Sequence, residues 1–595
     1  MNCPSRPDEP AAHDGWNQNP SKLAADVTTR QDLNGIVNLR TGQDSVKEAE
    51  DARGGSQIDG PNDYHRIADP DGTSSFRQRI GTSRSIHTVK SFPEIRPAKT
   101  HGSVEPRGEF PFLGNISPPR FPSSFFLRIW RTLAKFCGFI GPGFMISVAY
   151  IDPGNYSTDV SAGAATKYKL LFIVLLSNVF AIVLQSLAVR LGTVTGLNLA
   201  QHCRAHLPRW LNIVLYIVGE CAIVATDIAE VIGSAIALNL LIKVPLVWGC
   251  VITIFDVLII LIFYSPNGST RRLRAFEYFI IILVLGVVVC FCIQLSYIRD
   301  ASVREVLDGF VPSSAIVKGQ GIYLSCGILG ATVMPHSLYL GSGLVQPRLI
   351  DFDIAARNYS GPDVTDRSNK NLYRPSLAAI RSCLSYSTAE VIISLFTFAL
   401  FVNSAILIVA GASLSSSSAA ESGNLFGIHD LLSTTLAPVA GTIFALALLL
   451  SGTSAGIVCT IAGQMLSEGA LQWKVAPWVR RLLTRSISIV PSIIVAGAVG
   501  KEGLSAALNG TQFALSIALP FISAPLIYFT CRNKYMVVGG TESVEGEEMG
   551  QELQPEAEKV KMRNHRLVSA LAVAIWLVIT IMDVASLVFA GLGEA

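Results

Sequence analysis

The hydrophobic residues of this 595-residue chain lie in long runs separated by short polar stretches. Eleven runs approach the ~20 residues that a helix needs to cross a bilayer, unlike the alternating ten-residue segments of a membrane β-barrel. They cover residues 136–163, 169–192, 211–241, 245–264, 275–298, 320–346, 383–411, 436–469, 483–500, 505–530 and 567–591. Because 50% of the residues are hydrophobic and only 15% are charged, we predict an all-α integral membrane protein.

The first and sixth runs are each interrupted by a polar, helix-breaking tetrapeptide. These are Asp152-Pro153-Gly154-Asn155 and Met334-Pro335-His336-Ser337. A proline inside a helix removes a backbone hydrogen bond, and freed carbonyl groups are tolerated in a membrane only facing protein or a water-filled cavity. The breaks lie five spans apart, and this odd offset inverts one set of five spans relative to the other. The pattern predicts an inverted 5+5 repeat with an eleventh helix, typical of secondary transporters; two ordinary proline kinks are the alternative.

The division of the chain follows from the same runs. Residues 1–125 are rich in charged residues, Ser, Gly and Pro, and we expect a disordered cytosolic tail. A transporter core of ten spans is predicted over 126–530, a cytosolic loop over 531–566, and the eleventh helix with the carboxyl terminus over 567–595. Since a long polar tail precedes the first apolar run, no cleavable signal peptide is expected. The basic Ser/Thr-rich stretch 82–90 is a candidate for phosphorylation, lipid contact or regulatory proteins, or is simply a solvated linker.

The Lys and Arg residues between the runs indicate the orientation. Twenty lie in the loops that face inward if the amino terminus is cytosolic, and seven lie in the outward loops. By the positive-inside rule, the amino terminus is cytosolic and the carboxyl terminus extracellular or luminal. The plasma membrane and an endosomal or vacuolar membrane both fit. The net charge of +3 is too small to indicate nucleic-acid binding, and the eleven cysteines include no CxxC pair, which favours a packing role.

The first break carries oxygen ligands. Asp152 supplies a carboxylate and Asn155 a side-chain carbonyl, while Pro153 and Gly154 open the helix so that both groups can face inward. An Asp at the bilayer centre costs ~2.5 kcal/mol or more, so it marks an ion or proton path.

The second break adds a softer ligand. Met334 offers a thioether, and the break frees the backbone carbonyl of Ala331. Calcium and magnesium take oxygen ligands, whereas a thioether favours transition metals. A lone Met usually packs in a core, but beside a broken helix that faces Asp152 we predict a site for Mn²⁺, Fe²⁺ or a heavier divalent ion.

The third run carries three acidic residues, Glu220, Asp227 and Glu230, on one face of the predicted helix. Buried neighbouring carboxyl groups favour a bound proton, so the series can conduct one. Arg485, with Arg481 one turn before it, is the predicted counter-charge. A structural salt-bridge network is the alternative interpretation.

Together these motifs resemble the NRAMP family of proton-coupled divalent-metal transporters, for which DPGN in the first span and MPH in the sixth are signatures. The resemblance extends over about residues 125–530 and includes Ala462-Gly463-Gln464. It implies a LeuT-like fold with spans 1 and 6 broken, and import of Mn²⁺, Fe²⁺ or related ions into the cytosol with H⁺. It also implies that the metal ion is cargo, that no cofactor is needed and that the chain is not an enzyme.

The resemblance assigns a set of metal ligands: Asp152, Asn155, Met334, the carbonyls of Ala331 and Ala149, and the side chain of Gln512. Gln512 could instead bond a neighbouring helix. Many members have Asn and a second histidine where this chain has Ser337 and Gly341, a difference typical of fungal members. This leaves His336, or a path from Asp152 to Asp227, as the proton-handling candidates.

Three other functions are alternatives to metal transport. A LeuT-like symporter of an organic solute would need a site for a carboxylate and an amine, which Asp152 and Met334 do not suit. A transporter-like metal sensor would signal through its tails without bulk flux. A membrane enzyme is disfavoured because the sequence has no convincing nucleophile-base pair or catalytic zinc motif. No GxxxxGK[ST] phosphate loop is present, so a proton gradient is the expected energy source. We expect Asp256 and Glu390 to pair helices.

Overall fold

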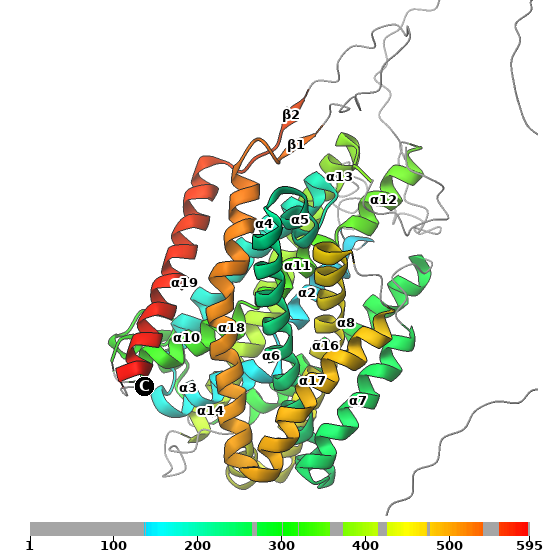
Figure 1. Cartoon of the computed structure of the whole chain (residues 1–595). Coiled ribbons are helices and arrows are strands. Elements are labelled where there is room, and N and C mark those ends of the chain that lie inside the picture. Colours follow the sequence, from blue (N-terminus) through cyan, green and yellow to red (C-terminus); the bar gives the residue numbers. More distant parts are fainter. Residues whose placement is uncertain are drawn as a thin grey trace, which may run out of the picture. The chain divides into compact units, whose positions relative to one another are not determined.

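The computed structural model describes residues 136–592 except 137, 264–269, 300, 319, 358–372, 415–424, 473–475 and 539–558. The predicted tail 1–125 and most of the predicted loop 531–566 therefore lie outside the described residues, as do the side chains of Asp256 and Arg481. The described part is almost entirely helical (Figure 1). Each of the eleven hydrophobic runs contains one main helix or a pair of helices.

The main helices follow the chain in this order: α2 (Pro142–Val148), α3 (Pro153–Thr166), α4 (Leu171–Thr195), α6 (Arg209–Ile242), α7 (Leu246–Phe263), α8 (Thr270–Tyr297), α10 (Gly321–Thr332), α11 (Pro335–Gly343), α13 (Leu377–Ser394), α14 (Leu400–Leu414), α16 (Pro438–Leu471), α17 (Pro477–Ala498), α18 (Gly500–Cys531) and α19 (Arg566–Leu592). Within the described ranges, eight helices are long and apolar enough to cross a membrane. The helices of the fourth and ninth runs are apolar over shorter stretches. The first run is divided into the two shorter helices α2 and α3.

The first and sixth runs are broken at the predicted positions. In the first, α2 ends at Val148 and α3 begins at Pro153; in the sixth, α10 ends at Thr332 and α11 begins at Pro335. The seventh run is also irregular, because a π-helical turn at Leu395–Ala399 joins α13 to α14. Helices α2 to α8 and α10 to α18 form the two sets of five spans, and α19 is the eleventh span.

Helices distant in sequence pack closely in the core. The third span α6 packs against α16, α3 against α14, α11 against α4, and α10 against α18. Small residues permit the closest approach: Pro153, the first residue of α3, fills the space beside Gly233 of α6, where a Cβ would overlap the proline ring. The broken span is therefore held directly against the helix that carries the three acidic residues.

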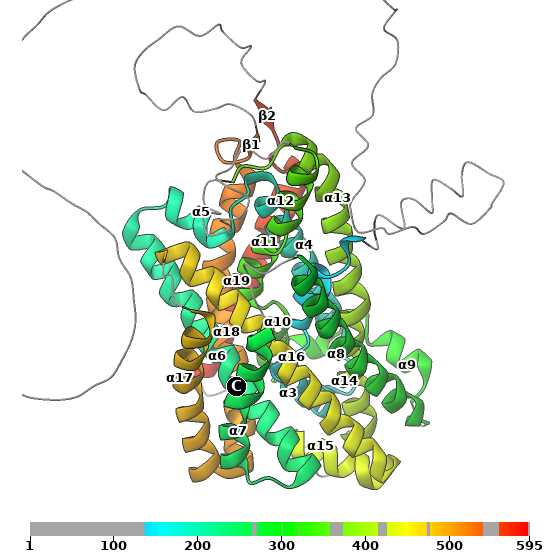
Figure 2. The same cartoon turned by 90° about the vertical axis from the view of Figure 1, so that its right-hand side faces the viewer.

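Several short elements between the spans were not predicted. They are α5 (Leu199–His206), α9 (Val303–Asp308), a 3₁₀ turn (Ser314–Ile316), α12 (Gln346–Ala355), α15 (Leu425–Leu431) with a π-helical turn (Leu432–Leu436), and an antiparallel pair of two-residue strands, β1 (Val537–Val538) and β2 (Val560–Lys561). In both views α5, α12 and the strand pair lie toward one end of the helices, and Figure 2 shows α15 at the other end. Helices α5 and α12 and the strand pair lie in the connections after spans 2, 6 and 10. Connections that follow even-numbered spans must lie on the same side of a membrane, and these three share one end of the helices.

Candidate metal site between the broken helices

The first break presents one carboxylate oxygen of Asp152 to the interior. Asp152 is the N-cap of α3, and its Oδ1 accepts a hydrogen bond from the backbone N–H of Asn155 at 2.9 Å. The residue is 1% exposed. Its second oxygen, Oδ2, is buried and has no hydrogen-bond partner among the described residues. Since an unpaired buried oxygen is costly, this atom suits a cation or a proton.

Neighbouring side chains satisfy the carbonyls that the first break frees. The carbonyl of Tyr150 accepts from Asn155 Nδ2 at 2.8 Å and from Asn403 Nδ2 at 3.1 Å. The carbonyl of Ile151 accepts from Ser451 Oγ at 2.8 Å. Ala149, whose carbonyl is a predicted ligand, is the C-cap of α2. The unwound backbone is thus held by protein donors, as a break inside a membrane requires.

The second break has a similar local structure. Met334 is the N-cap of α11 with extended backbone angles, and Pro335 occupies the first helical position, where a missing N–H costs little. Ser337 donates to the Met334 carbonyl from its backbone N–H at 3.2 Å and from Oγ at 2.6 Å. Met334 and Ala331, at the end of α10, are fully buried.

Gln512 of α18 lies between the two breaks. A Cβ at Gly154 would overlap the Gln512 side-chain amide, and a Cβ at Gly330 would approach the Gln512 backbone oxygen to 2.5 Å. Gln512 Nε2 donates to Thr511 Oγ1 at 3.1 Å, whereas its Oε1 is buried without a hydrogen-bond partner in the described part of the chain. The structure therefore places a second unpaired oxygen beside the first break.

A buried hydrogen-bond network joins the breaks on another side. The Tyr150 hydroxyl lies 2.9 Å from Ser337 Oγ, and Gln185 Nε2 of α4 donates to both, at 2.9 Å and 2.7 Å. Ser337 is one of the two departures from the common family pattern. The other, Gly341, gives Gln185 its space, because a Cβ there would overlap Gln185 Oε1. Sequence reasoning missed Gln185, since a single Gln in an apolar run carries no spacing signal.

The three acidic residues of α6 form two separate ion-paired groups. Arg485 Nη1 of α17 lies 3.5 Å from Asp227 Oδ1 and 3.2 Å from Glu230 Oε2, and all three residues are buried. Glu220 instead lies 2.5 Å from Nη2 of Arg480. Arg485 was predicted as the counter-charge, whereas the pairing of Arg480 with Glu220 was not predicted. The side chain of Arg481, the other predicted counter-charge, lies outside the described set.

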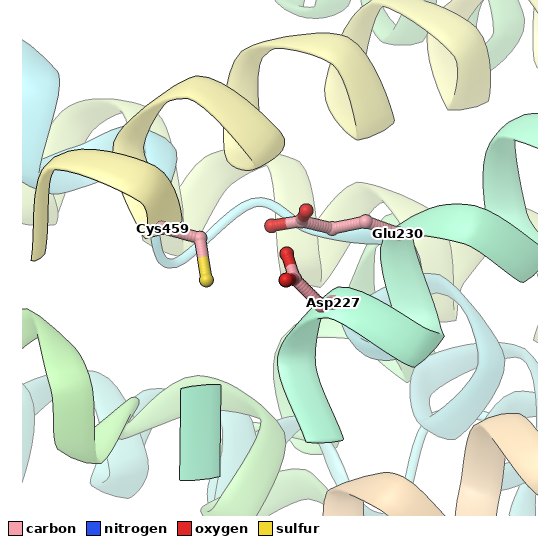
Figure 3. Close-up of side chains that lie close together, drawn as sticks. All are labelled: Asp227, Glu230 and Cys459. Atoms are coloured by element: carbon pink, nitrogen blue, oxygen red, sulfur yellow. The ribbon is translucent and has the colours of Figure 1, made fainter. Parts of the chain in front are cut away.

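Cys459 adds a thiol to the buried acidic pair. It projects from α16 toward Asp227 and Glu230 (Figure 3), and one ligand atom of each residue lies within 4.8 Å of the others. Cys459 also lines a small pocket with Ile223, Thr460, Gly463, Arg480 and Thr484. This contact could not be predicted from the sequence, because a single cysteine in an apolar run carries no spacing signal.

His336 lies between the metal-ligand candidates and the acidic residues. It is the second residue of α11, is 1% exposed, and its Nδ1 lies 3.4 Å from Thr226 Oγ1 of α6. Thr226 directly precedes Asp227. The predicted proton-handling residues are therefore adjacent to the second break.

The fold defines a class of protein: a multi-pass helical membrane protein with the inverted repeat of a transporter. A family model described as "Natural resistance-associated macrophage protein-like" matches residues 143–539, and the chain belongs to this Nramp family, whose members are transporters and not enzymes. Two relatives come from Saccharomyces cerevisiae. The manganese transporter SMF1 is 49% identical over 498 residues, 78% of this chain and 87% of the relative. The iron transporter SMF3 is 50% identical over 410 residues, 69% and 84% of the two chains.

The fold agrees with a solved structure. A crystal structure of the Eremococcus coleocola manganese transporter with a bound aromatic bis-isothiourea compound is similar with a TM-score of 0.62 and 31% identity. The match covers 78% of this chain and 88% of that one. The sequence-based prediction of the fold class and of the family is thus confirmed.

Proposed function

We propose that this protein imports divalent transition-metal ions, Mn²⁺ or Fe²⁺, into the cytosol together with H⁺. The observation that carries the proposal is the buried Asp152 Oδ2, which has no donor in the described part of the chain and lies in a helix break beside Gln512. A carboxylate oxygen, amide oxygens, backbone carbonyls and the Met334 thioether form a mixed oxygen and sulfur set that suits Mn²⁺ or Fe²⁺ better than Ca²⁺. The two yeast relatives, which are named a manganese transporter and an iron transporter, support the same substrate class.

The proposed mechanism couples the metal to a proton through neighbouring groups. Metal binding at Asp152 displaces any proton held there, so metal affinity is pH-linked. His336 lies next to the metal-ligand candidates and contacts Thr226, and the Asp227–Glu230–Arg485 group follows on α6. Rigid-body movement of the two repeats around this centre would expose it to each side in turn.

The proposed orientation follows the charge distribution. With a cytosolic amino terminus, the end that carries α5, α12 and the strand pair faces the cytosol, and the carboxyl terminus after α19 is extracellular or luminal. The plasma membrane and an endosomal or vacuolar membrane are both compatible with this orientation.

The test is Mn²⁺ uptake into proteoliposomes with and without an inwardly directed acid gradient. We expect acid-stimulated uptake by the unmodified protein and a loss of at least about a hundredfold in Asp152→Asn, since that variant lacks the only carboxylate among the proposed ligands. Asp583→Asn is the matched control, because Asp583 is a buried carboxyl of α19 that bonds Ser516. Uptake by this control should stay within about twofold of the unmodified protein.

Other results would redirect the interpretation. Verified, folded protein that carries no Mn²⁺ or Fe²⁺ would favour the sensor or the organic-solute symporter. Uptake that is equal with and without the acid gradient would remove the proton from the mechanism while leaving the metal.

A further inference from the structure

The Gln185 side chain contacts both halves of the candidate metal site without being a candidate ligand itself. It lies in the middle of α4, is fully buried, and its Nε2 bonds the Tyr150 hydroxyl and Ser337 Oγ. Tyr150 belongs to the first break and Ser337 to the second. Gln185 therefore bonds one hydroxyl from each break.

The direction of each hydrogen bond follows from the available protons. Ser337 Oγ has one proton, and it points at the Met334 carbonyl 2.6 Å away. Ser337 Oγ must therefore accept from both Tyr150 and Gln185. The Tyr150 proton is then used on Ser337, so Tyr150 Oη accepts the other Gln185 N–H. In this assignment of donors and acceptors, each N–H and O–H of the network has one acceptor.

Two candidate ligands lie at the ends of this network. On one branch, the Tyr150 carbonyl accepts from Asn155 Nδ2 at 2.8 Å, which fixes the Asn155 amide. On the other branch, Ser337 holds the backbone of Met334. A shift of Gln185 would thus move an oxygen ligand and the sulfur ligand relative to each other.

The space for Gln185 depends on one glycine. Gly341 lies two turns after Met334 on α11, and a Cβ at this position would overlap Gln185 Oε1 and approach Ala188 Cβ to 3.5 Å. Gln185 Oε1 has no hydrogen-bond partner within the described ranges. Its position is therefore set by shape, by the two N–H bonds and by the missing side chain at Gly341.

We propose that Gln185 is a positioning residue that sets the spacing between Asn155 and Met334, and with it the affinity for the transported ion. The proposal rests on the proposed function, because it assumes that these two residues bind the metal. Gln185 does not touch the ion; it acts through Tyr150 and Ser337.

The first experiment compares Gln185→Leu with the unmodified protein in Mn²⁺ uptake. Leu has a similar volume but no N–H, so the two breaks lose their common donor. We expect the KM for Mn²⁺ to rise about tenfold, as for the loss of one to two net hydrogen bonds, while Vmax stays within about twofold. Calorimetric titration of the purified protein with Mn²⁺ alone should show the same loss of affinity.

Gln294→Leu is the matched control. Gln294 of α8 is also a fully buried Gln in a spanning helix, and neither of its side-chain polar atoms has a hydrogen-bond partner in the described part of the chain. Its replacement should leave the KM unchanged. A general loss of packing would lower Vmax, yield and Tm in both variants without the tenfold change in KM.

Smaller changes test the network if Gln185→Leu folds poorly. Tyr150→Phe and Ser337→Ala each remove one hydroxyl, and each should raise the KM; combined with Gln185→Leu they should add little, because they break the same network. Gly341→Ala should also raise the KM by displacing Gln185. In Gly341→Ala combined with Gln185→Ala, the effect should be no larger than in Gln185→Ala alone.

The outcomes separate the two proposals. Unmodified protein that neither binds nor carries Mn²⁺ would overturn the proposed function. Unmodified protein that carries Mn²⁺, with an unchanged KM in Gln185→Leu and Ser337→Ala or with fully additive effects in the double variants, would overturn the positioning role and leave the transport function intact.

Discussion

At the residue scale, the proposed choice between metal ions depends on Met334. Its side chain is completely buried where α11 begins, and its carbonyl is already used by Ser337, so the thioether is the group left to face an ion. A thioether binds Mn²⁺, Fe²⁺ and softer ions far better than it binds Ca²⁺, for which oxygen ligands are needed.

We therefore predict that Met334→Ala relaxes the exclusion of Ca²⁺. Removal of the sulfur leaves oxygen ligands and room for water, so the ratio of Mn²⁺ to Ca²⁺ uptake should fall by about tenfold, the effect of ~1.4 kcal/mol in relative affinity. Isotope uptake with both ions in the same vesicles measures this ratio. Met465→Ala, at a Met that packs against Gly343, should preserve the ratio, and a preserved ratio in Met334→Ala would contradict the sulfur's role.

The sequence indicated the ligand candidates but not the residues that hold them. Asp152, Asn155 and Met334 stand out because a polar group beside a proline is costly in an apolar run. Gln185 and Arg480 do not stand out, since their roles depend on contacts between helices that are distant in the chain. From the sequence, Gly341 is only a difference from the common family pattern. Its role in making space for Gln185 became apparent once the structure placed the two residues in contact.

At the element scale, proline alone does not decide where a helix breaks. Pro491 lies inside the continuous helix α17, and Pro520 and Pro525 lie inside α18. Pro153 and Pro335 instead start new helices, preceded by unwound residues whose carbonyls accept bonds from Asn155, Ser451 and Ser337. These two breaks thus combine a proline with nearby hydrogen-bond donors. The polar residues beside Pro153 and Pro335 indicated the breaks, whereas the prolines in apolar surroundings did not interrupt their helices.

The start of α2 has its own stabilising contact. Glu390 of α13 accepts from the backbone N–H groups of Gly141 and Gly143 at 2.6 Å and 2.9 Å, and Arg348 lies 3.4 Å from its other oxygen. Arg348 also lies 3.5 Å from Glu277 of α8. Glu390 therefore pairs helices, as expected, and caps the first half of the broken span with a negative charge.

We predict that Glu390→Gln destabilises the protein by about 1–3 kcal/mol, because Gln keeps an acceptor for the N–H groups but leaves Arg348 with less compensating charge. Thermal unfolding in detergent should show a lower Tm. Glu305→Gln, which removes an exposed pair with Lys167, should change stability by less than about 0.5 kcal/mol. Equal Tm values for the two variants would show that the buried contact is not needed.

At the scale of the whole molecule, the order of the spans was predictable and the connections between them were not. The hydrophobic runs and the offset between the breaks define the two sets of five spans. The short helices α5, α9, α12 and α15 and the strand pair are too short to cross a bilayer, so they lack the long apolar runs from which the spans are predicted. The positions of these short elements depend on how the spans pack together, and the hydrophobic pattern of the sequence does not describe that packing.

The proposed metal and proton routes meet where α11 contacts α6. Met334 and His336 begin α11, His336 lies 3.4 Å from Thr226, and the next residue, Asp227, is held with Glu230 by Arg485. In the proposed mechanism, a proton that leaves Asp152 on metal binding would pass to His336 and then to the Asp227–Glu230–Arg485 group, which is separate from the Glu220–Arg480 pair. Because these groups are not themselves proposed metal ligands, a substitution among them could abolish H⁺ transport while the metal ligands stay in place.

We predict that Asp227→Asn uncouples the two flows. Asn preserves the size of the side chain but cannot take up a proton, so Mn²⁺ uptake should continue while its stimulation by an inward acid gradient falls to about a tenth or less. A pH-sensitive dye inside the vesicles should record little H⁺ entry during Mn²⁺ uptake, whereas Glu305→Gln should retain both flows. If Asp227→Asn kept full H⁺ entry, Asp227 would serve only as an ion pair for Arg485, and the proton would have to reach the cytosol by another route.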